Sequence, residues 1–268
     1  MKFFDCFMYH DEDLVLDIRL NILNQYINKF VIIESRFDHQ GNKKKLNFKL
    51  ANKEFVNKIK YIVIEEQFPN PKNGWDCEKF QREKLLLGLK DANNDDYIMY
   101  SDSDEIPNPE MLKSISLNSK YGIFLQKMFV YKLNVYNSYE TPWEGTRICK
   151  KKHLKSIDWL RQKVLSKNLK YGFWRIYKER NIQIIDNGGW HFNYLLDPKD
   201  ISKKFKSLAE TSWDKEKFYN EKIIEDKIKK KQDLFERGHT YEYVSIDDSY
   251  PDYLRENLNK YSKWIINE

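Results

Sequence analysis

Short runs of β-branched and aromatic residues alternate with helical patterns through the first hundred residues of this chain. Each run ends at a polar or turn-forming segment, and the runs span residues 3–8, 30–34, 60–64 and 97–100. Between the first two runs, apolar residues recur every four positions, at Leu14, Ile18, Ile22 and Tyr26. That spacing places them on one face of a helix. Strands that alternate with helices are typical of a mostly parallel sheet flanked by helices. The sequence therefore predicts an α/β fold.

Further strand and helix patterns follow. The predicted elements are a helix from Asp76 to about Leu89, two strands within residues 121–136 and a strand at residues 182–185. Beyond Pro198 the composition changes to a highly charged segment with sparse apolar residues. A single apolar stripe is typical of helices that pack one face on a neighbouring domain. We therefore expect an α/β domain over residues 1–197 and a helical extension over residues 198–268 packed on it.

The composition indicates a folded, soluble protein. The 268 residues are 41% hydrophobic and 15% aromatic, which is enough to form a core and is unlike a disordered chain. No apolar run approaches the roughly 18 residues that span a bilayer, and acids occupy early positions where a signal peptide needs an apolar stretch. The cysteines, Cys6, Cys77 and Cys149, form neither a disulfide framework nor a zinc motif. We therefore expect a cytoplasmic protein without a transmembrane segment.

The net charge of +6 is a weak argument for nucleic-acid binding. Only nine of the 47 basic residues are Arg. The planar guanidinium of Arg binds bases and phosphates at two points and is better suited to them than the ammonium group of Lys. The lysines form separate runs instead of one stripe, at residues 43–45, 150–152 and 229–231. The alternative function is a lysine-rich and aromatic-rich nucleic-acid-binding module. Its binding would fall steeply with salt and would need no metal.

The most informative motif follows the strand of residues 97–100. That strand runs directly into acids, so Asp102, Asp104 and Glu105 lie at the carboxyl edge of the sheet, where open α/β folds bind ligands. In an extended segment, residues two apart face the same way, so Asp102 and Asp104 can converge on one target. Two adjacent carboxylates repel each other unless a cation lies beside them. The sequence therefore predicts a site for Mg²⁺ or Mn²⁺, with water and substrate phosphates completing its coordination.

Other enzymes that use paired acids fit this motif less well. A haloacid-dehalogenase-type phosphatase has its Asp-x-Asp pair on the first strand, whereas this pair begins at residue 102. A nucleotidyltransferase needs a Gly-Ser element shortly upstream of its acids, and we find none here. The structural alternative is an acidic loop before a helix, with Asn108 as its cap and Pro109 in the first helical position. A sugar-nucleotide transferase fits best.

Seven short blocks occur along the chain in a characteristic order. They are Phe4-Asp-Cys-Phe-Met-Tyr-His-Asp-Glu-Asp-Leu, Asp17-Ile-Arg-Leu, Phe30-Val-Ile-Ile-Glu-Ser, Gln40-Gly-Asn-Lys-Lys-Lys-Leu-Asn-Phe, Gln81-Arg, Asp102-Ser-Asp-Glu-Ile-Pro and Gly188-Gly-Trp-His-Phe-Asn-Tyr. Through these blocks the chain resembles glycosyltransferase family 17, and the resemblance covers roughly residues 3–210. The resemblance implies a GT-A-type (Rossmann-like) mixed sheet, a divalent metal, a UDP-sugar donor and an inverting reaction. The simplest donor is UDP-GlcNAc and the acceptor a glycan or glycoconjugate. A catalytically silent sugar-binding relative is a further alternative.

The chemistry of glycosyl transfer suggests roles for residues near the donor. A metal can neutralise the charge of the departing phosphate, and Asp104 is its predicted ligand. Asp102 is expected to reach the ribose or to share the metal through water. Arg82 is predicted to offer a cation to the pyrophosphate, or to be a surface helix residue. Glu34 is predicted to contact ribose or uracil, or to be a structural cap. Arg19, inside the first helix, is a weaker candidate for donor contact.

The block around His191 is predicted to return to the same site. Gly188 and Gly189 let the backbone turn sharply and deliver the imidazole to a crowded position. GT-A enzymes often supply a late histidine to the metal, so the resemblance implies ligation by His191, and imidazole suits Mn²⁺ better than Mg²⁺. A structural histidine is the alternative. Trp190 is predicted either to stack on a sugar or to fill the core.

Inversion requires a carboxylate that deprotonates the acceptor hydroxyl as it attacks. The sequence leaves this residue open. Glu144 is the first candidate because it lies beside Trp143, an aromatic residue that can hold a sugar. The competing candidates are Asp158, Asp186 and Glu105.

Overall fold

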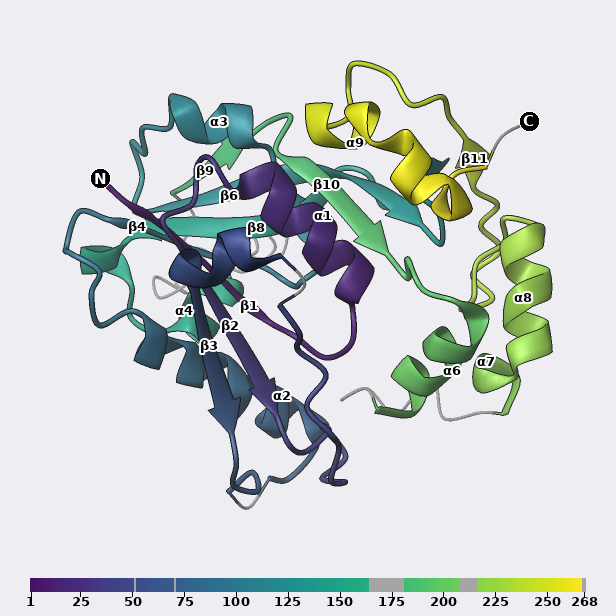
Figure 1. The fold of residues 1–268 in the computed structure, drawn as a ribbon, viewed down its shortest axis with the longest axis horizontal. Coiled ribbons are helices and arrows are strands. Elements are labelled where there is room, and N and C mark those ends of the chain that lie inside the picture. The colour runs from purple at the N-terminus through teal and green to yellow at the C-terminus, as the bar shows by residue number, and fades with distance from the viewer. Residues whose placement is uncertain (51, 70, 164–180, 208–215, 267–268) are drawn as a thin grey trace.

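The computed structural model contains a large mixed sheet with helices on both faces (Figure 1). It describes residues 1–50, 52–69, 71–163, 181–207 and 216–266. Within these ranges, no helix has the length and apolar character needed to cross a membrane. The predicted α/β class, a mixed sheet flanked by helices with a helical C-terminal segment, is confirmed.

The sheet joins eleven strands of the described residues. Its parallel part has the order β4-β1-β2-β3, with bounds β1 (Phe3–Met8), β2 (Lys29–Ser35), β3 (Ile59–Ile64) and β4 (Tyr97–Tyr100). Beside β4 the sheet continues with two antiparallel strands, β8 (Trp143–Lys150) and then β6 (Tyr121–Val130). Because β1 to β4 run the same way, their carboxyl ends meet at one edge. The acidic motif directly after β4 therefore lies where the sequence predicts.

Five shorter strands adjoin this frame: β5 (Glu105–Pro107), β7 (Val135–Tyr136), β9 (Ile182–Ile185), β10 (Gly189–Asn193) and β11 (Glu242–Tyr243). Strand β10 runs parallel to β6 and antiparallel to β5. Its register places His191 opposite Glu105 on one side and Met128 on the other. The pairing of β10 with β5 thus brings the late histidine back to the acidic motif.

The helices of the described residues are α1 (Asp13–Leu23), α2 (Gly74–Lys84), α3 (Pro109–Lys113), α4 (Ile157–Arg161), α6 (Pro198–Ser207), α7 (Glu216–Tyr219), α8 (Glu221–Lys229) and α9 (Asp252–Glu256), with 3-10 helices at Lys53–Lys58, Leu85–Gly88, Lys151–His153 and Leu258–Trp264. Of these, α1 and α2 lie on opposite faces of the parallel strands. Helix α1 packs against α9 and α2 against α4. Alternate residues of β1 and β2 enter different cores: Phe7 and Phe30 join the core under α1, whereas Phe4 and Val31 join the core under α2.

Both ends of one helix differ from the prediction. The helix predicted from Asp76 to Leu89 begins at Gly74, because the Asn73 side chain accepts a hydrogen bond from the Asp76 backbone N–H. It changes to a 3-10 turn at Leu85–Gly88, where a Cβ on Gly88 would lie 2.3 Å from Val31 Cγ1. Helix α1 begins at Asp13 after Glu12, which makes no side-chain capping bond. The predicted cap of α3 is present, since Asn108 accepts from the Glu110 N–H.

The C-terminal segment packs on the sheet (Figure 1). Helices α6, α7 and α8 contact one another and group beside the end of β10. Ile201 and Ile224 of these helices share a core with Val130, Tyr131 and Val135. The segment therefore buries its apolar stripe against β6 and β7. The domain boundary at residue 197 stays a prediction.

Candidate active site

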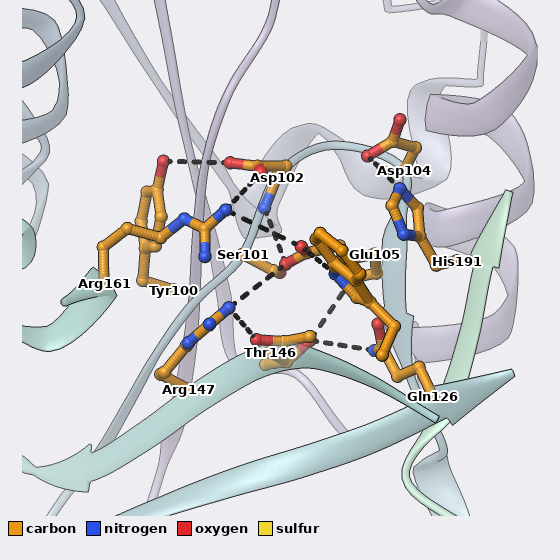
Figure 2. Close-up of polar contacts among 12 residues, drawn as sticks. Tyr100, Ser101, Asp102, Asp104, Glu105, Gln126, Thr146, Arg147, Arg161 and His191 are labelled. Atoms are coloured by element: carbon orange, nitrogen blue, oxygen red, sulfur yellow. Dashed lines mark hydrogen bonds and ion pairs between the residues drawn. The ribbon is translucent and has the colours of Figure 1, made fainter. Parts of the chain in front are cut away.

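The acidic motif forms a tight turn at the carboxyl end of β4. The Glu105 backbone N–H donates to the Asp102 carbonyl oxygen at 3.1 Å. The turn replaces the extended backbone that the sequence suggested, so Asp102 and Asp104 face different partners. Figure 2 shows Asp102 directed toward Arg161 and Asp104 toward His191.

The buried Arg19 side chain fixes this turn by hydrogen bonds to its backbone. The residue is fully buried, and its guanidinium forms a two-point ion pair with Asp5, at 2.6 and 2.8 Å. The same group donates to four atoms around the turn: the Ser101 hydroxyl at 2.6 Å and the carbonyl oxygens of Asp102, Ser103 and Glu105 at 3.2, 3.2 and 2.8 Å. Arg19 does not line the cavity, so the predicted donor contact is replaced by a positioning role. Its charge satisfies carbonyls that would otherwise be buried without donors.

Asp104 and His191 form a buried pair. The Asp104 Oδ1 atom lies 3.5 Å from His191 Nε2, and the two side chains are 11% and 7% exposed. The Phe192 backbone N–H donates to the Asp104 carbonyl oxygen at 2.9 Å, which fixes β10 beside the turn. The structure therefore brings together two of the three residues predicted as metal ligands.

Two glycines make this approach possible. A Cβ on Gly188 would lie 2.6 Å from the Leu125 backbone nitrogen, and a Cβ on Gly189 would lie 2.1 Å from the Ile106 carbonyl oxygen. Gly189 also has a φ of 126°, which residues with a side chain rarely adopt. The glycine pair therefore lets β10 enter between β5 and β6 and places His191 at the site.

Asp102 and Glu105 contact arginines on the other side of the turn. Arg161 Nη2 lies 2.9 Å from Asp102 Oδ2 and 4.0 Å from Glu105 Oε1. Glu105 is fully buried and accepts a hydrogen bond from the Trp143 indole N–H at 2.8 Å. Arg147 lies 3.9 Å from the same carboxylate. Glu105, a candidate base in the sequence, therefore holds Trp143 in place and is not exposed to an acceptor.

A cavity of about 510 Å³ opens around the Asp104–His191 pair. One wall comes from the ends of β1 and β2, from α2 and from the turn after β4. The opposite wall comes from β6, β10 and the segment Asp233–Tyr241, and Trp143 also contributes. The volume is in the range typical of pockets for small molecules. The two halves meet at Asp104 and His191.

Two other predicted donor-binding residues lie outside the cavity lining. The Glu34 carboxylate is fully buried and binds Lys44 at 2.7 Å, the Tyr61 hydroxyl at 2.7 Å and two backbone N–H groups of residues 47 and 48. Arg82 is buried and binds Asp158 at 2.5 Å, the Tyr100 hydroxyl at 3.1 Å and Glu78. The structural alternative for Glu34 therefore describes this geometry, because its carboxylate secures a loop. Arg82 is not the surface helix residue of its alternative, because it is buried and joins α2 to α4.

The remaining predicted residues are also placed away from the pair. Glu144 lies on β8 opposite Leu125, outside the cavity lining. The Asp158 carboxylate forms a salt bridge with Arg82. Asp186 and Trp190 line a second cavity, and the Trp190 indole N–H donates to the Ser249 carbonyl oxygen at 3.0 Å. Since Trp190 and His191 are neighbours on a strand, they face opposite sides of the sheet.

Sequence reasoning missed several residues of the cavity. Arg161 is the last residue of helix α4, whose N-cap is Ser156, and is the arginine that contacts Asp102. Glu140, Asp233 and Arg237 belong to loops with no recognisable motif. Trp143, which the sequence offers as a sugar-binding aromatic beside Glu144, lines the cavity although Glu144 does not. These residues come from segments far apart in the sequence. Their proximity arises from the tertiary structure, which the sequence does not reveal.

The Asp104–His191 pair fits a divalent cation. Within the described ranges, no three His, Cys, Asp or Glu side chains gather into a metal-binding group. A carboxylate oxygen and an imidazole nitrogen 3.5 Å apart can nevertheless share one ion, because Mg²⁺ and Mn²⁺ keep waters and substrate phosphates as their other ligands. Among the described residues, the buried His191 Nδ1 has no hydrogen-bond partner, so Nε2 makes the polar contact of this ring, with Asp104. Asp102 would reach such an ion only after leaving Arg161.

Burial and charge act oppositely on the two groups. Burial alone would raise the pKa of Asp104, but the charge of His191 and its hydrogen bond lower it well below the usual range. Burial alone would lower the pKa of His191, but Asp104 raises it. Without metal, the raised pKa of His191 and the lowered pKa of Asp104 thus both favour the charged forms of the pair.

The metal-free protein should lose stability as pH rises above 6.5. A histidine with a raised pKa stabilises the fold fully below its unfolded value, about 6.5, and loses this contribution as pH passes its folded pKa. Asp104, with a lowered pKa, contributes above about pH 4 and loses its contribution only in acid. Urea denaturation in EDTA between pH 6 and 9 measures the effect, with His191→Gln as comparison. Identical profiles for the two proteins would contradict the ion pair.

Comparison with protein families gives a match that includes both halves of this site. The sequence model of glycosyltransferase family 17 matches residues 1–250. The chain belongs to glycosyltransferase family 17. Membership of this family confirms the predicted enzyme class, a glycosyltransferase.

Curated relatives match a smaller part of this family 17 protein. The β-1,4-mannosyl-glycoprotein 4-β-N-acetylglucosaminyltransferases of Homo sapiens and Rattus norvegicus are each 31% identical over 108 residues, which is 37% of this chain and 20% of theirs. The matched part is thus about a fifth of the length of those relatives. Among solved structures, the chain is similar to S. aureus TarS 1–349 (TM-score 0.36, 15% identity, 77% of this chain and 64% of that chain). It is also similar to a glycosyltransferase involved in glycosylation of the major capsid of PBCV-1 (TM-score 0.33, 12% identity, 69% and 82%).

Proposed function

We propose that this protein is a metal-dependent, inverting glycosyltransferase. It transfers a sugar, most simply GlcNAc from UDP-GlcNAc, to a hydroxyl of a glycan or glycoconjugate. The observation that supports this best is the Asp104–His191 pair inside a cavity at the carboxyl end of β4. The names of the curated relatives support GlcNAc as the donor sugar.

Asp104 and His191 would hold Mn²⁺ or Mg²⁺. When bound, such an ion supplies Lewis-acid stabilisation to the departing phosphate. Arg161 takes the role that the sequence gave to Arg82, because its side chain is 21% exposed and lines the cavity. Its salt bridge to Asp102 holds the guanidinium beside the turn, where it can donate to a diphosphate oxygen.

Trp143 is the best-placed aromatic residue for the donor sugar. Its indole ring lies 5.2 Å from the His191 ring centroid, and Glu105 fixes its N–H. The ring is therefore held against the metal-binding histidine. This position replaces Trp190, which faces the other side of the sheet.

The proposed base is Glu140. Inversion requires a carboxylate on the acceptor side of the anomeric carbon. Glu140 and Asp233 are carboxylates on the wall opposite the β1 and β2 ends. Both carboxylates bind Arg237. The Asp233 side chain also accepts from Tyr241 and is 1% exposed, whereas the Glu140 side chain also accepts from Asn137 and is 26% exposed. The greater exposure leaves Glu140 better able to reach an acceptor hydroxyl.

A donor-hydrolysis screen tests the function. Purified protein is incubated with UDP, GDP and CMP sugars in Mn²⁺, Mg²⁺ or EDTA, and nucleotide release is measured. We expect UDP-GlcNAc to be hydrolysed with metal and to be stable in EDTA. Donor binding without release in any acceptor mixture would favour the catalytically silent relative. Salt-sensitive oligonucleotide binding without any donor binding would favour the nucleic-acid-binding alternative.

A further inference from the structure

The cavity extends past His191 to a second wall. This wall contains four aromatic residues, Tyr131, Tyr194, Phe235 and Tyr241, and the pair Glu140 and Arg237. Strands β6 and β10 supply its base, and the Asp233–Tyr241 segment covers it. Segments far apart in the sequence thus form one surface.

Glu140, Asp233 and Arg237 form an ion-pair network on this wall. Arg237 binds Asp233 at 2.8 and 3.1 Å and Glu140 at 3.1 and 3.3 Å. Asn137 Nδ2 donates to Glu140 at 2.8 Å, and the Tyr241 hydroxyl donates to Asp233 at 3.1 Å. The two carboxylates and one guanidinium have a formal charge of −1. The network therefore orders its polar groups and offers no net positive charge.

The aromatic part of the wall is held rigidly. Tyr131 and Tyr194 have left-handed backbones, with φ of 64° and 51°, which is costly for bulky residues and is common at functional sites. The Tyr131 N–H donates to the Asn193 carbonyl oxygen at 3.0 Å. The Phe235 ring centroid lies 6.1 Å from that of Tyr194 and 5.6 Å from that of Phe205. The wall therefore presents fixed aromatic surface beside fixed polar groups.

We propose that this wall is the acceptor subsite and that it binds an uncharged sugar ring. The inference rests on the proposed function, because it assigns the second substrate of that reaction. A nucleoside diphosphate is anionic. Carboxylates also line the other half of the cavity, so the cation that Asp104 and His191 would hold, together with Arg161, is what would bind the diphosphate there. Lys204 lies 5.7 Å from the Tyr194 ring centroid but pairs with Glu12 at 3.1 Å, so the Glu140, Asp233 and Arg237 network keeps its charge of −1 and would repel a diphosphate. Aromatic faces cover the apolar face of a sugar, and paired carboxylate and guanidinium groups bind its hydroxyls. The same negative charge disfavours acceptors with a carboxylate or phosphate.

Acceptor choice and one substitution test the subsite. With UDP-GlcNAc and Mn²⁺, transfer is measured to methyl glycosides of neutral hexoses, of N-acetylhexosamines and of hexuronic acids. We expect kcat/KM at least about tenfold higher for a neutral glycoside than for its uronic acid counterpart. Phe235→Ala should raise the acceptor KM at least about tenfold and the donor KM less than about twofold, while Phe235→Tyr should keep both near wild type. Equal use of uronic acids, or a parallel rise of both KM values, would overturn the inference.

A matched control and a second readout separate this inference from the proposed function. Phe3 also belongs to an aromatic pair, with its ring centroid 5.2 Å from that of Tyr97, but lies outside the cavity lining, so Phe3→Ala should leave both KM values unchanged. Saturation-transfer NMR then measures binding of the same methyl glycosides without any donor. If the wild type turns over no nucleotide sugar, the proposed function fails, but binding that Phe235→Ala abolishes still supports the subsite. No binding of any neutral glycoside, or equal binding by Phe235→Ala, contradicts it.

Discussion

Asp104→Asn should lower the rate of donor turnover at least about 100-fold, because electrostatic stabilisation at the departing phosphate is worth several kcal/mol. The fold should persist. His191 can lose its proton when the partner carboxylate is gone, so the free energy of unfolding should fall by only about 1 to 2 kcal/mol. UDP release from UDP-GlcNAc and urea denaturation measure the two effects.

Asp186→Asn is the matched control for this substitution. Asp186 was a candidate from the sequence, but it lines the cavity on the other side of the sheet. Its neutralisation should leave turnover near wild type. Near-normal activity of Asp104→Asn that persists in EDTA would remove the metal role of Asp104.

Arg19→Met should destabilise the protein by about 3 to 5 kcal/mol, the usual cost of leaving one member of a buried ion pair without its partner. Asp5 is fully buried and pairs with Arg19, so the substitution leaves its charge uncompensated. The turn would also lose its donor to three carbonyl oxygens. Urea denaturation measures the loss of stability.

A double variant separates the positioning role of Arg19 from its role in stability. Asp5→Leu combined with Arg19→Met removes both buried charges and should recover much of the lost stability. Activity and Mn²⁺ affinity should stay low, because the turn still lacks the donors that fix Asp104. Recovery of activity together with stability would show that Arg19 acts only through the fold.

The strands and the acidic motif are predictable because their signals are local. Buried parallel strands read as β-branched runs, and the predicted run at residues 3–8 coincides with β1. The Asn108 cap is local in the same way. The placement of His191 is also indicated locally, by Gly188 and Gly189. Only glycines fit where β10 enters beside β5.

The roles of the arginines and of Glu34 are not predictable in this way. Arg19, Arg82 and Arg161 all lie on helices, and their partners across the sheet decide which of them reaches the cavity. Glu34 ends β2 near the site, but the loop at residues 44–48 folds over its carboxylate. Strand alternation predicts that Trp190 and His191 face opposite sides, but the tertiary structure determines which one faces the cavity.

Binding of Mn²⁺ in the presence and absence of UDP tests the central claim most directly. Free Mn²⁺ is followed by electron paramagnetic resonance as protein is titrated, for the wild type and for His191→Ala. If Asp104 and His191 hold an ion whose shell the phosphates complete, UDP should tighten Mn²⁺ binding to the wild type at least about tenfold, by thermodynamic coupling. His191→Ala should bind Mn²⁺ more weakly with UDP present, and excess metal should partly restore its activity. Equal Mn²⁺ affinity of the two proteins, or an affinity that UDP leaves unchanged, would contradict a shared metal and donor site at this pair.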